Sequence, residues 1–445
     1  MAPPPPLTPA ADALEMLSRA LTASPADATA LALVETRRTT AGVRGARAPR
    51  VERELVARVV EAGRPGAFRG AGTAPHELEE AVRHAMARAR GAARRADGVP
   101  LLAGPRPAGA ETAGSGPELH DAGLAALDGE AAQNLLSKLL RAEEAGRLTW
   151  WEVALTVVGT GGVARHLRAT GVALEVRGRG GAHGQATGAA RTLQALEPDS
   201  ILERARRRAG TDAAAEDAPG GGNVVLSAEA AAALVSALGA LALSAPAWED
   251  PLAYPRRHAG GRVLAHQLDL VEDAARSPGL PFPLGLAGGE RATAALVAGG
   301  ILRGPVADPL EAEALGVAAT SPFWVGEPGS AEHLHLLPGG AGEDELLRAA
   351  GDGIFVGEIE RVACFDRGSL AARVATRGRR RIAGGELGGT LPPATWEVEL
   401  PAALATVLAL GRDTVTLPAA PFGGVTAPGI ALRPAGAWLP PASGP

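Results

Sequence analysis

The sequence predicts an α+β fold, in which an N-terminal α/β part with small sheets and helices precedes a larger, β-rich C-terminal domain with a buried central helix. Amphipathic helix patterns alternate with β-rich runs in the first half of the chain, and strand-like runs dominate the C-terminal part. Between them, Ala228–Leu243 is apolar on nearly all sides, which is typical of a buried helix. Because a bilayer requires about 20 apolar residues, this shorter segment is expected in the core of a soluble domain.

Composition and charge limit the class of protein. The chain has 445 residues, enough for two or three domains, and 46% of them are hydrophobic, which permits packed cores. The net charge of −5 argues against a dedicated nucleic-acid binder. Cys364 is the single cysteine, so no disulfide can form within the chain. The start, MAPPPPL, lacks the basic and apolar regions of a secretory signal, and no apolar segment is long enough to span a membrane, so we expect a cytoplasmic protein.

Shifts in composition divide the chain into an extension with a helix (1–24), an N-terminal domain (25–95), a linker (96–118), a central α+β domain (119–212) and a C-terminal domain (220–445). The elements expected before the first linker are helix Ala10–Thr22, strands Ala30–Thr40 and Val51–Ala62, a turn at Gly63–Gly66, and a helix that begins at Pro75. That last helix has a clear core stripe, formed by Leu78, Ala81, Val82, Ala85 and Met86.

The central domain reads as a meander with a helix on each side. Its expected elements are a helix from about Glu130 to Ala145, strands Trp150–Val158, Val163–Ala169 and Val172–Arg177, a glycine-rich loop or hairpin at Arg177–Gly188, and helix Asp199–Arg208. A second linker, Ala213–Gly222, follows.

The C-terminal domain begins with a short buried strand, Val224–Leu226, that leads into the apolar helix. Ser227 can cap this helix by accepting a hydrogen bond from its first turn, and Glu229 lies where the helix dipole favours a carboxylate. The likeliest later strands are Phe355–Ile359, Leu370–Ala375, Trp396–Leu400, Thr414–Leu417 and Ile430–Leu432, and a short helix is expected from Pro401 to near Gly411.

Histidines supply the candidate metal ligands. His76 and His84 lie too far apart to share one helical turn, and His84 follows Glu80 by four residues, as in an ordinary helix pair. His333 and His335 are better candidates, because alternate residues of a strand share a face and two imidazoles there could bind zinc. The alternative is a solvated strand face with the leucines inward, and no third ligand is near in the sequence.

Other motifs are expected to be structural. The glycines at 159–162 and 178–181 do not stand between a strand and a helix, as phosphate binding requires, so turns are expected there. The arginine-rich runs 204–208 and 377–381 have no interleaved aromatic residues and are expected to be solvated, with an anion-facing role as the alternative. Cys364 has apolar neighbours and is expected in the core.

The buried helix lacks the residues for metal chemistry. Buried helices can carry two histidines one turn apart with a glutamate between them, a pattern that binds zinc and activates water. Ala228–Leu243 has no His, Asp or Cys, and its one carboxylate lies at its start. The sequence therefore assigns no catalytic, cofactor-binding or metal-binding residue.

Several stretches, in order, resemble the TldD/PmbA (modulator of DNA gyrase) family. They are AFRGAGTAPHELEEAVRHAMARAR at 67–90, VVLSAEAAAALVSAL at 224–238, and GDGIFVGEIERV, RRRIAGGELGG, VLALGRDTVTL and FGGVTAPGIALRP in the tail. The resemblance covers most of the chain and implies a PmbA/TldD-like N-terminal domain at 25–95 and a PmbA/TldD-like, β-rich C-terminal domain at 220–445. It also implies a heterodimer, in which the TldD-type subunit is a zinc peptidase that cuts unfolded peptides, including leader segments of ribosomally made natural products.

In the TldD type, the corresponding helix carries His-Glu-x-x-x-His, and a late cysteine completes the zinc site. Here Val235–Ala240 occupies that region, Gly411–Pro434 contains no cysteine, and Cys364 falls too early to match. The resemblance therefore implies a TldE (PmbA)-like, non-catalytic subunit without a cofactor, with zinc in a TldD-like partner and an unfolded peptide as substrate. The alternatives are an independent peptidase or amidase with a variant metal site at His333 and His335, and a DNA-gyrase-associated modulator.

Overall fold

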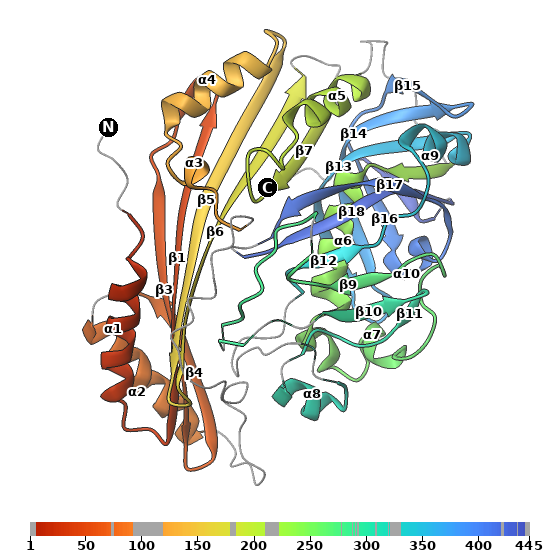
Figure 1. Cartoon of the computed structure of the whole chain (residues 1–445). Helices are drawn as coiled ribbons and strands as arrows, with labels where there is room; N and C mark the ends of the chain where they lie inside the picture. The colour runs from red at the N-terminus through yellow and green to blue at the C-terminus, as the bar shows by residue number, and fades with distance from the viewer. Residues whose placement is uncertain are drawn as a thin grey trace.

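The computed structural model describes residues 6–440 apart from 73–74, 92–118, 179–183, 210–221, 277, 287, 290, 292, 308, 319, 321–330, 420–421 and 434. An elongated N-terminal sheet with helices stands beside a C-terminal domain of strands and shorter helices (Figure 1). The predicted α+β fold is confirmed. The predicted linker 96–118, nearly all of the second linker and the glycines at 179–181 lie outside the described residues.

The N-terminal sheet is antiparallel and contains strands from both the predicted N-terminal and the predicted central domain. Its order is β4-β3-β1-β5-β6-β7, with β2 beside β1. The strands are β1 (Ala28–Gly42), β2 (Gly45–Ala46), β3 (Arg50–Glu61), β4 (Arg64–Ala71), β5 (Glu144–Gly159), β6 (Val163–Gly178) and β7 (Gln185–Ala190). The pairing of β1 with β5 joins the two halves, for example through Val34 opposite Leu155.

Strand β6 corrects one prediction, because the two strands expected at Val163–Ala169 and Val172–Arg177 are a single strand. Gly171 lies between the two expected strands. It continues the pairing opposite Trp151, and a Cβ at this position would lie 2.3 Å from the Trp151 ring. The glycine is required by a neighbouring strand rather than by a turn.

Helices cover one face of the N-terminal sheet, here called the outer face. They are α1 (Ala10–Thr22), α2 (Pro75–Gly91), α3 (Ala122–Ala125), α4 (Gly129–Leu139) and α5 (Pro198–Arg208). The stripe that begins at Leu78 is buried with residues of α1, β1 and β3, as predicted. Helix α4 is shorter than expected. Leu140 is extended and strand pairing begins at Glu144, opposite Gly178, so the chain cannot remain helical to Ala145.

The opposite, inner face of this sheet packs against the C-terminal domain. Apolar residues of β1, β3, β5 and β6 form one buried cluster with Phe282, Leu284, Leu286 and Phe422. Phe282 and Phe422 are in ring contact, with 4.7 Å between their centroids. The two parts of the chain therefore share a core rather than only a linker.

Among the described residues, the C-terminal sheet has twelve strands, in the order β11-β10-β9-β12-β18-β8-β13-β14-β16-β19, with β15 beside β14 and β17 beside β18. The strands are β8 (Asn223–Leu226), β9 (Leu270–Glu272), β10 (Ala294–Ala298), β11 (Ile301–Leu302), β12 (Leu334–Leu336), β13 (Gly353–Asp366), β14 (Ala371–Ala383), β15 (Glu386–Thr390), β16 (Ala394–Glu399), β17 (Val407–Pro418), β18 (Gly424–Leu432) and β19 (Ala437–Leu439). The accompanying helices are α6 (Ala228–Ala242), η1 (Ala245–Trp248), α7 (Tyr254–Arg257), α8 (Pro309–Leu315), α9 (Glu343–Ala350) and α10 (Leu400–Leu404). The helix expected from Pro401 to near Gly411 is therefore shorter, because β17 begins at Val407 and pairs with Leu432.

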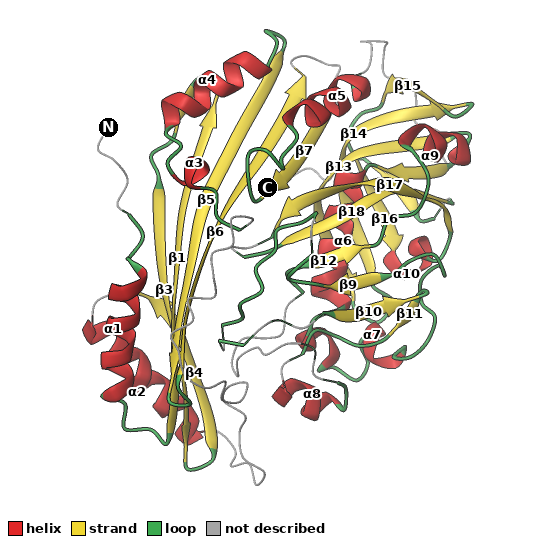
Figure 2. Ribbon diagram, viewed as in Figure 1, coloured by secondary structure: helices red, strands yellow, loops and turns green. Residues whose placement is uncertain are grey.

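Helix α6 is the central element of this domain, enclosed among its strands (Figure 2). Ser227 Oγ accepts a hydrogen bond from the Ala230 amide at 3.0 Å, which confirms the predicted cap. Most of its side chains are buried, and only Ser236 and Ala240 are exposed. No helix in the described part of the chain is long and apolar enough to cross a membrane.

Candidate functional site

Helix α6 occupies the position where zinc peptidases of the resembling family are expected to carry their metal ligands. Its two exposed positions, Ser236 and Ala240, lie one turn apart, and neither side chain is a strong metal ligand. Across the residues that the structure describes, no group of three or more His, Cys, Asp or Glu side chains is placed to hold a metal ion.

The carboxylate at the start of α6 belongs to a buried ionic cluster, defined here as Arg208, Glu229 and Glu343. Arg208 Nη1 lies 2.8 Å from Glu229 Oε2, and Arg208 Nη2 lies 2.7 Å from Glu343 Oε2. Only 3% of the Arg208 side chain is exposed. The cluster joins the ends of α5, α6 and α9. The run 204–208 is therefore only partly solvated, because Arg208 is buried whereas Arg207 is exposed.

Charge interactions dominate the protonation of this cluster. Burial alone would raise the pKa of Glu229, but the positive charges of Arg208 and Arg204 outweigh burial and hold that pKa below its ordinary value. Burial would likewise lower the pKa of Arg208, and the two carboxylates reverse that effect. Glu229 and Arg208 are therefore both charged at neutral pH, and the cluster acts as an ionic clamp rather than as an acid or base.

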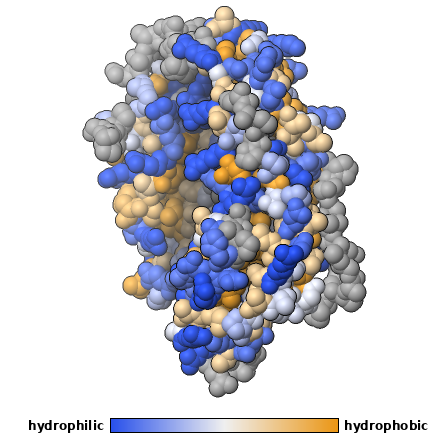
Figure 3. Space-filling view, turned by 90° about the vertical axis from the view of Figure 1, so that its left-hand side faces the viewer, coloured by the Kyte–Doolittle hydropathy of each residue, from blue (hydrophilic) through white to orange (hydrophobic). Residues whose placement is uncertain are grey.

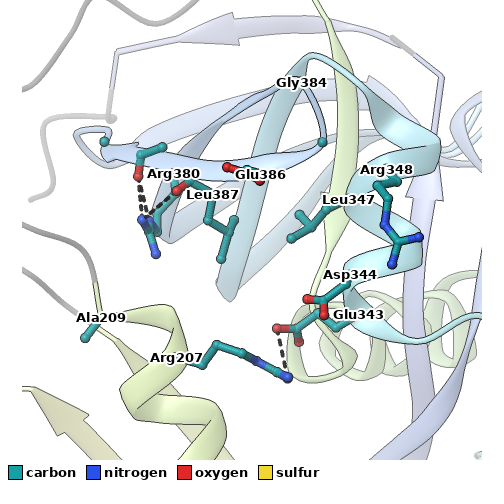
Figure 4. A pocket seen from close by; sticks show the side chains of 13 residues that line it. Arg207, Ala209, Glu343, Asp344, Leu347, Arg348, Arg380, Gly384, Glu386 and Leu387 are labelled. Carbon is teal, nitrogen blue, oxygen red and sulfur yellow. Dashed lines mark hydrogen bonds and ion pairs between the residues drawn. The ribbon is translucent and has the colours of Figure 1, made fainter.

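A cavity of about 800 Å³ opens next to this clamp, between α5, α9 and the β14–β15 hairpin (Figure 4). Arg207 points to Glu343 across one side, with Arg207 Nη2 3.2 Å from Glu343 Oε1. On the other side, Arg380 donates hydrogen bonds to the Leu387 and Gly388 carbonyls. Charges of both signs line the cavity, and none of the side chains that line it is a Cys, Ser or His that could serve as a nucleophile or zinc ligand.

The histidine pair lies in the protein interior and not on a solvated strand face. His333 is 1% exposed and His335 is 4% exposed, and both leucines beside them are buried as well. Strand β12 is paired on both edges, with β9 and β18. Its faces are covered as well: Leu334 belongs to the core around α6, and the His335 ring lies against Gly279, where an added Cβ would be 2.9 Å from Cε1. The alternation of histidine and leucine in the sequence suggested one polar face and one apolar face. It could not show that both faces are buried in the folded protein.

The surroundings of His333 do not suit a metal ion. Its Nδ1 lies 3.1 Å from Arg291 Nη1, and a fixed guanidinium at this distance repels a divalent cation. Burial, reinforced by Arg291, lowers the pKa of His333 to about 3, and burial lowers the pKa of His335 to about 4. Burial also raises the pKa of Glu272 to about 7, although its carboxylate accepts hydrogen bonds from the His333 and Glu332 amides.

Arg191 ties this region to the N-terminal sheet. Its guanidinium donates to the carbonyls of Thr170, Leu280, Pro281 and Phe422, at distances between 2.6 and 3.0 Å. Thr170 belongs to β6, whereas the other three carbonyls belong to the C-terminal domain. The histidine region is therefore part of the junction between the two parts of the chain, which favours a structural role.

The remaining motifs have separate outcomes. Arg379 and Arg380 are buried, so the second arginine run is only partly solvated, whereas Arg377 pairs with Glu360 near the surface. Cys364 is half-buried rather than in the core, and burial raises the pKa of its thiol. His84 pairs with Glu80 on α2, as expected, with 3.5 Å between Nε2 and Oε1.

A polar cluster that was not predicted from the sequence lies on the outer face of the N-terminal sheet. Glu152 is buried and bonded to three cationic or polar partners: Arg37 Nη2 at 2.8 Å, His120 Nε2 at 3.0 Å, and Arg168. Glu152 lies between the apolar cluster under α1 and α2 and the one under α3, α4 and α5. Figure 3 views the face that carries these helices and shows a hollow with hydrophilic side chains along its rim. A glutamate inside the apolar run Trp150–Val158 was the available signal.

Comparison with known proteins defines the class. Residues 219–435 match the family model for the PmbA/TldA metallopeptidase C-terminal domain. Among solved structures, TldE from Thermococcus kodakarensis superposes with a TM-score of 0.75 at 17% identity, over 95% of this chain and 99% of that one. No curated protein sequence matches the chain.

Two further structures share the fold. One is a protein from Thermotoga maritima described as a modulator of a DNA gyrase, with a TM-score of 0.75 at 16% identity over 95% of this chain and 99% of that one. The other, from Bacteroides thetaiotaomicron, has a similar description, with a TM-score of 0.71 at 16% identity over 96% of this chain and 98% of that one. The C-terminal domain thus belongs to the TldD/PmbA family, and the whole chain shares the fold of these structures.

Proposed function

We propose that the chain is the TldE-like, non-catalytic subunit of a TldD/TldE-type zinc metallopeptidase that cleaves unfolded peptides or peptide precursors, such as leader segments of natural products. The observation that carries this proposal is helix α6, which is capped, buried and central in the fold but has no zinc ligand. Zinc and the catalytic residues would belong to a TldD-like partner, and this subunit would supply part of an enclosed substrate chamber.

The exposed edge of α6 indicates how this subunit would act. A buried helix that exposes only Ser236 and Ala240 has small side chains at those two positions, which leave room for a peptide or a partner. Small side chains there are compatible with holding an extended peptide through backbone contacts, as in strand addition.

The test is to purify the chain alone and together with a TldD-like partner, and to measure zinc content and cleavage of an unfolded peptide. We expect zinc and cleavage only when the partner is present. Stoichiometric zinc or cleavage by the chain alone contradicts the proposal. A substitution gives a further test. Ala240→Trp places a large side chain at the exposed edge of α6 and should lower cleavage by the complex, whereas Glu203→Trp, on the exposed side of α5, should not.

The older description of two similar structures as modulators of DNA gyrase names a different class of function. The net charge of −5 gives DNA binding little support. A gel shift with duplex DNA at two salt concentrations separates the classes, because a binder that contacts phosphates must weaken as salt rises.

A further inference from the structure

The C-terminal end of the described chain lies along an edge of the large sheet. Strand β19 pairs with β16, with Trp396 opposite Trp438 and Thr395 opposite Leu439. Gly436 turns the chain into this position with φ of +72°, and a Cβ there would lie 2.1 Å from the Glu397 carbonyl oxygen. The segment 437–439 of the chain therefore pairs with the edge of β16 that does not face β14.

One side chain anchors this segment. Trp438 stacks on Trp396, with ring centroids 5.7 Å apart and an interplanar angle of 16°. The guanidinium carbon of Arg379 lies 4.4 Å from the centre of the Trp438 ring, a cation–π distance. Trp396 is fully buried, and its Nε1 donates to the Ala435 carbonyl at 2.6 Å.

Two of the N–H groups of Arg379 make no hydrogen bond to described residues. Its side chain is 1% exposed, and Nη1 donates to the Pro392 carbonyl at 2.7 Å. Within the described residues, Nε and Nη2 of Arg379 have no hydrogen-bond partner. A buried guanidinium with two unused N–H groups next to a removable aromatic ring is an unusual and costly arrangement for a purely structural contact.

The segment that covers these groups is held by few contacts. Strand β19 has three residues, of which Ala437 is exposed and Leu439 is 38% exposed. Short edge segments with few buried contacts open at a small fraction of the global unfolding free energy. Opening would free the β16 backbone edge, the Trp396 ring and the Arg379 donors together.

We propose that the edge of β16 is a binding site for an extended peptide that places an aromatic side chain against Trp396 and Arg379, and that residues 437–439 of the chain occupy this site in cis. Main-chain pairing with β16 supplies affinity for any extended segment. The stacking position selects an aromatic residue, and Gly436-Ala437-Trp438 shows that small residues precede it. The proposal does not depend on the function of α6 or on a zinc partner.

The cis segment must compete with any peptide in solution. A tethered segment has an effective concentration in the millimolar range, so an intact chain is expected to bind a free peptide weakly. The test therefore uses a chain that ends at Arg433 and a fluorescein-labelled peptide with the sequence of residues 434–445, with binding followed by fluorescence anisotropy. The matched control is the same peptide with Trp438→Ala.

We expect the shortened chain to bind the tryptophan peptide saturably, at least about tenfold more tightly than the intact chain does, because the tethered competitor is gone. The alanine peptide should bind at least about tenfold more weakly than the tryptophan peptide, because the aromatic anchor supplies most of the selectivity. Equal binding of the two peptides overturns the proposal.

A second variant covers the case in which the shortened chain fails to fold. The full-length chain with Trp438→Ala keeps the backbone of β19 and loses only the anchor, so it should bind the tryptophan peptide more tightly than the unmodified chain. If this variant is folded by circular dichroism and binds neither peptide, the edge of β16 is not a peptide site. Exchange of β19 only between two copies, seen as a dimer that a free peptide cannot dissociate, also overturns the proposal.

Discussion

Substitution of Arg208 by alanine provides the sharpest test of the ionic clamp at the start of α6. Arg208 contacts two carboxylates at 2.8 and 2.7 Å and is 3% exposed. Within the described residues, its removal leaves Glu229, whose side chain is 9% exposed, with Arg204 at 3.4 Å and the Thr187 amide as remaining partners. Removal of one partner of a buried ion pair costs about 3–5 kcal/mol, so Arg208→Ala should lower the free energy of unfolding by that amount.

The neighbouring arginine supplies the matched control. Arg207 contacts the same carboxylate, Glu343, at 3.2 Å, but its side chain is 46% exposed. Solvent screens such a pair, so Arg207→Ala should cost about 0–1 kcal/mol. Urea unfolding at pH 7, followed by the fluorescence of the six tryptophans, measures both variants under the same conditions. Similar losses in the two variants would refute the argument that burial sets the strength of the clamp.

The pH dependence gives an independent readout. Because the folded state holds the pKa of Glu229 below its ordinary value of 4.5, the stability from this group is present above pH 4.5 and is lost as pH falls below it. The difference between Arg208→Ala and the unmodified chain should therefore shrink as the pH falls below 4.5. The double variant Arg208→Met with Glu229→Gln should recover stability relative to Arg208→Ala, because no buried charge is left unpaired. A double variant less stable than the single one would contradict this explanation.

Three further predictions concern other parts of the fold. Gly171→Ala should lower the free energy of unfolding by about 1–3 kcal/mol, because the new methyl group overlaps the Trp151 ring on the adjacent strand. Gly389→Ala, which has no atom within 4 Å of the new methyl group, should change the free energy of unfolding little. Thermal melts compare the two variants. Burial keeps the pKa of His333 near 3, below its ordinary value of 6.5. The contribution of His333 to the free energy of unfolding therefore falls by up to about 1.4 kcal/mol per pH unit as the pH decreases from 6.5 towards 3. In urea titrations, His333→Gln should flatten that slope, whereas His84→Gln, at an exposed site, should not. Arg191→Met removes four hydrogen bonds, three of which cross the junction of the two parts. It should therefore increase amide exchange on both sides of the junction; unchanged exchange there would show that the apolar core alone holds the junction.

Local sequence patterns predicted the elements that depend on near neighbours. The cap at Ser227, the burial of α6 and the stripe from Leu78 to Met86 follow from residue type and spacing, which act within one or two turns of helix. The ends of elements were less predictable. The stop of α4 and the continuity of β6 through Gly171 are set by partners on other strands.

At the candidate site, too, local properties could be predicted from the sequence, whereas properties set by distant partners could not. The sequence by itself determined that α6 carries no histidine or cysteine and only one carboxylate, Glu229, because the identity of a side chain does not depend on folding. It could not determine the environment of charged side chains. Arg208, Arg379 and His333 were read as surface residues or as ligands, and the fold buries all three.

The physical reason is that burial and electrostatic pairing are properties of surfaces brought together from distant parts of the chain. Glu343 lies 135 residues from Arg208, and Trp438 meets Arg379 only because β19 returns to the edge of the sheet. The sequence thus determined which chemical groups are present and which local elements they favour. Only the tertiary structure decided which charges are neutralised in the interior, which histidines are enclosed and which strand edge the segment 437–439 covers.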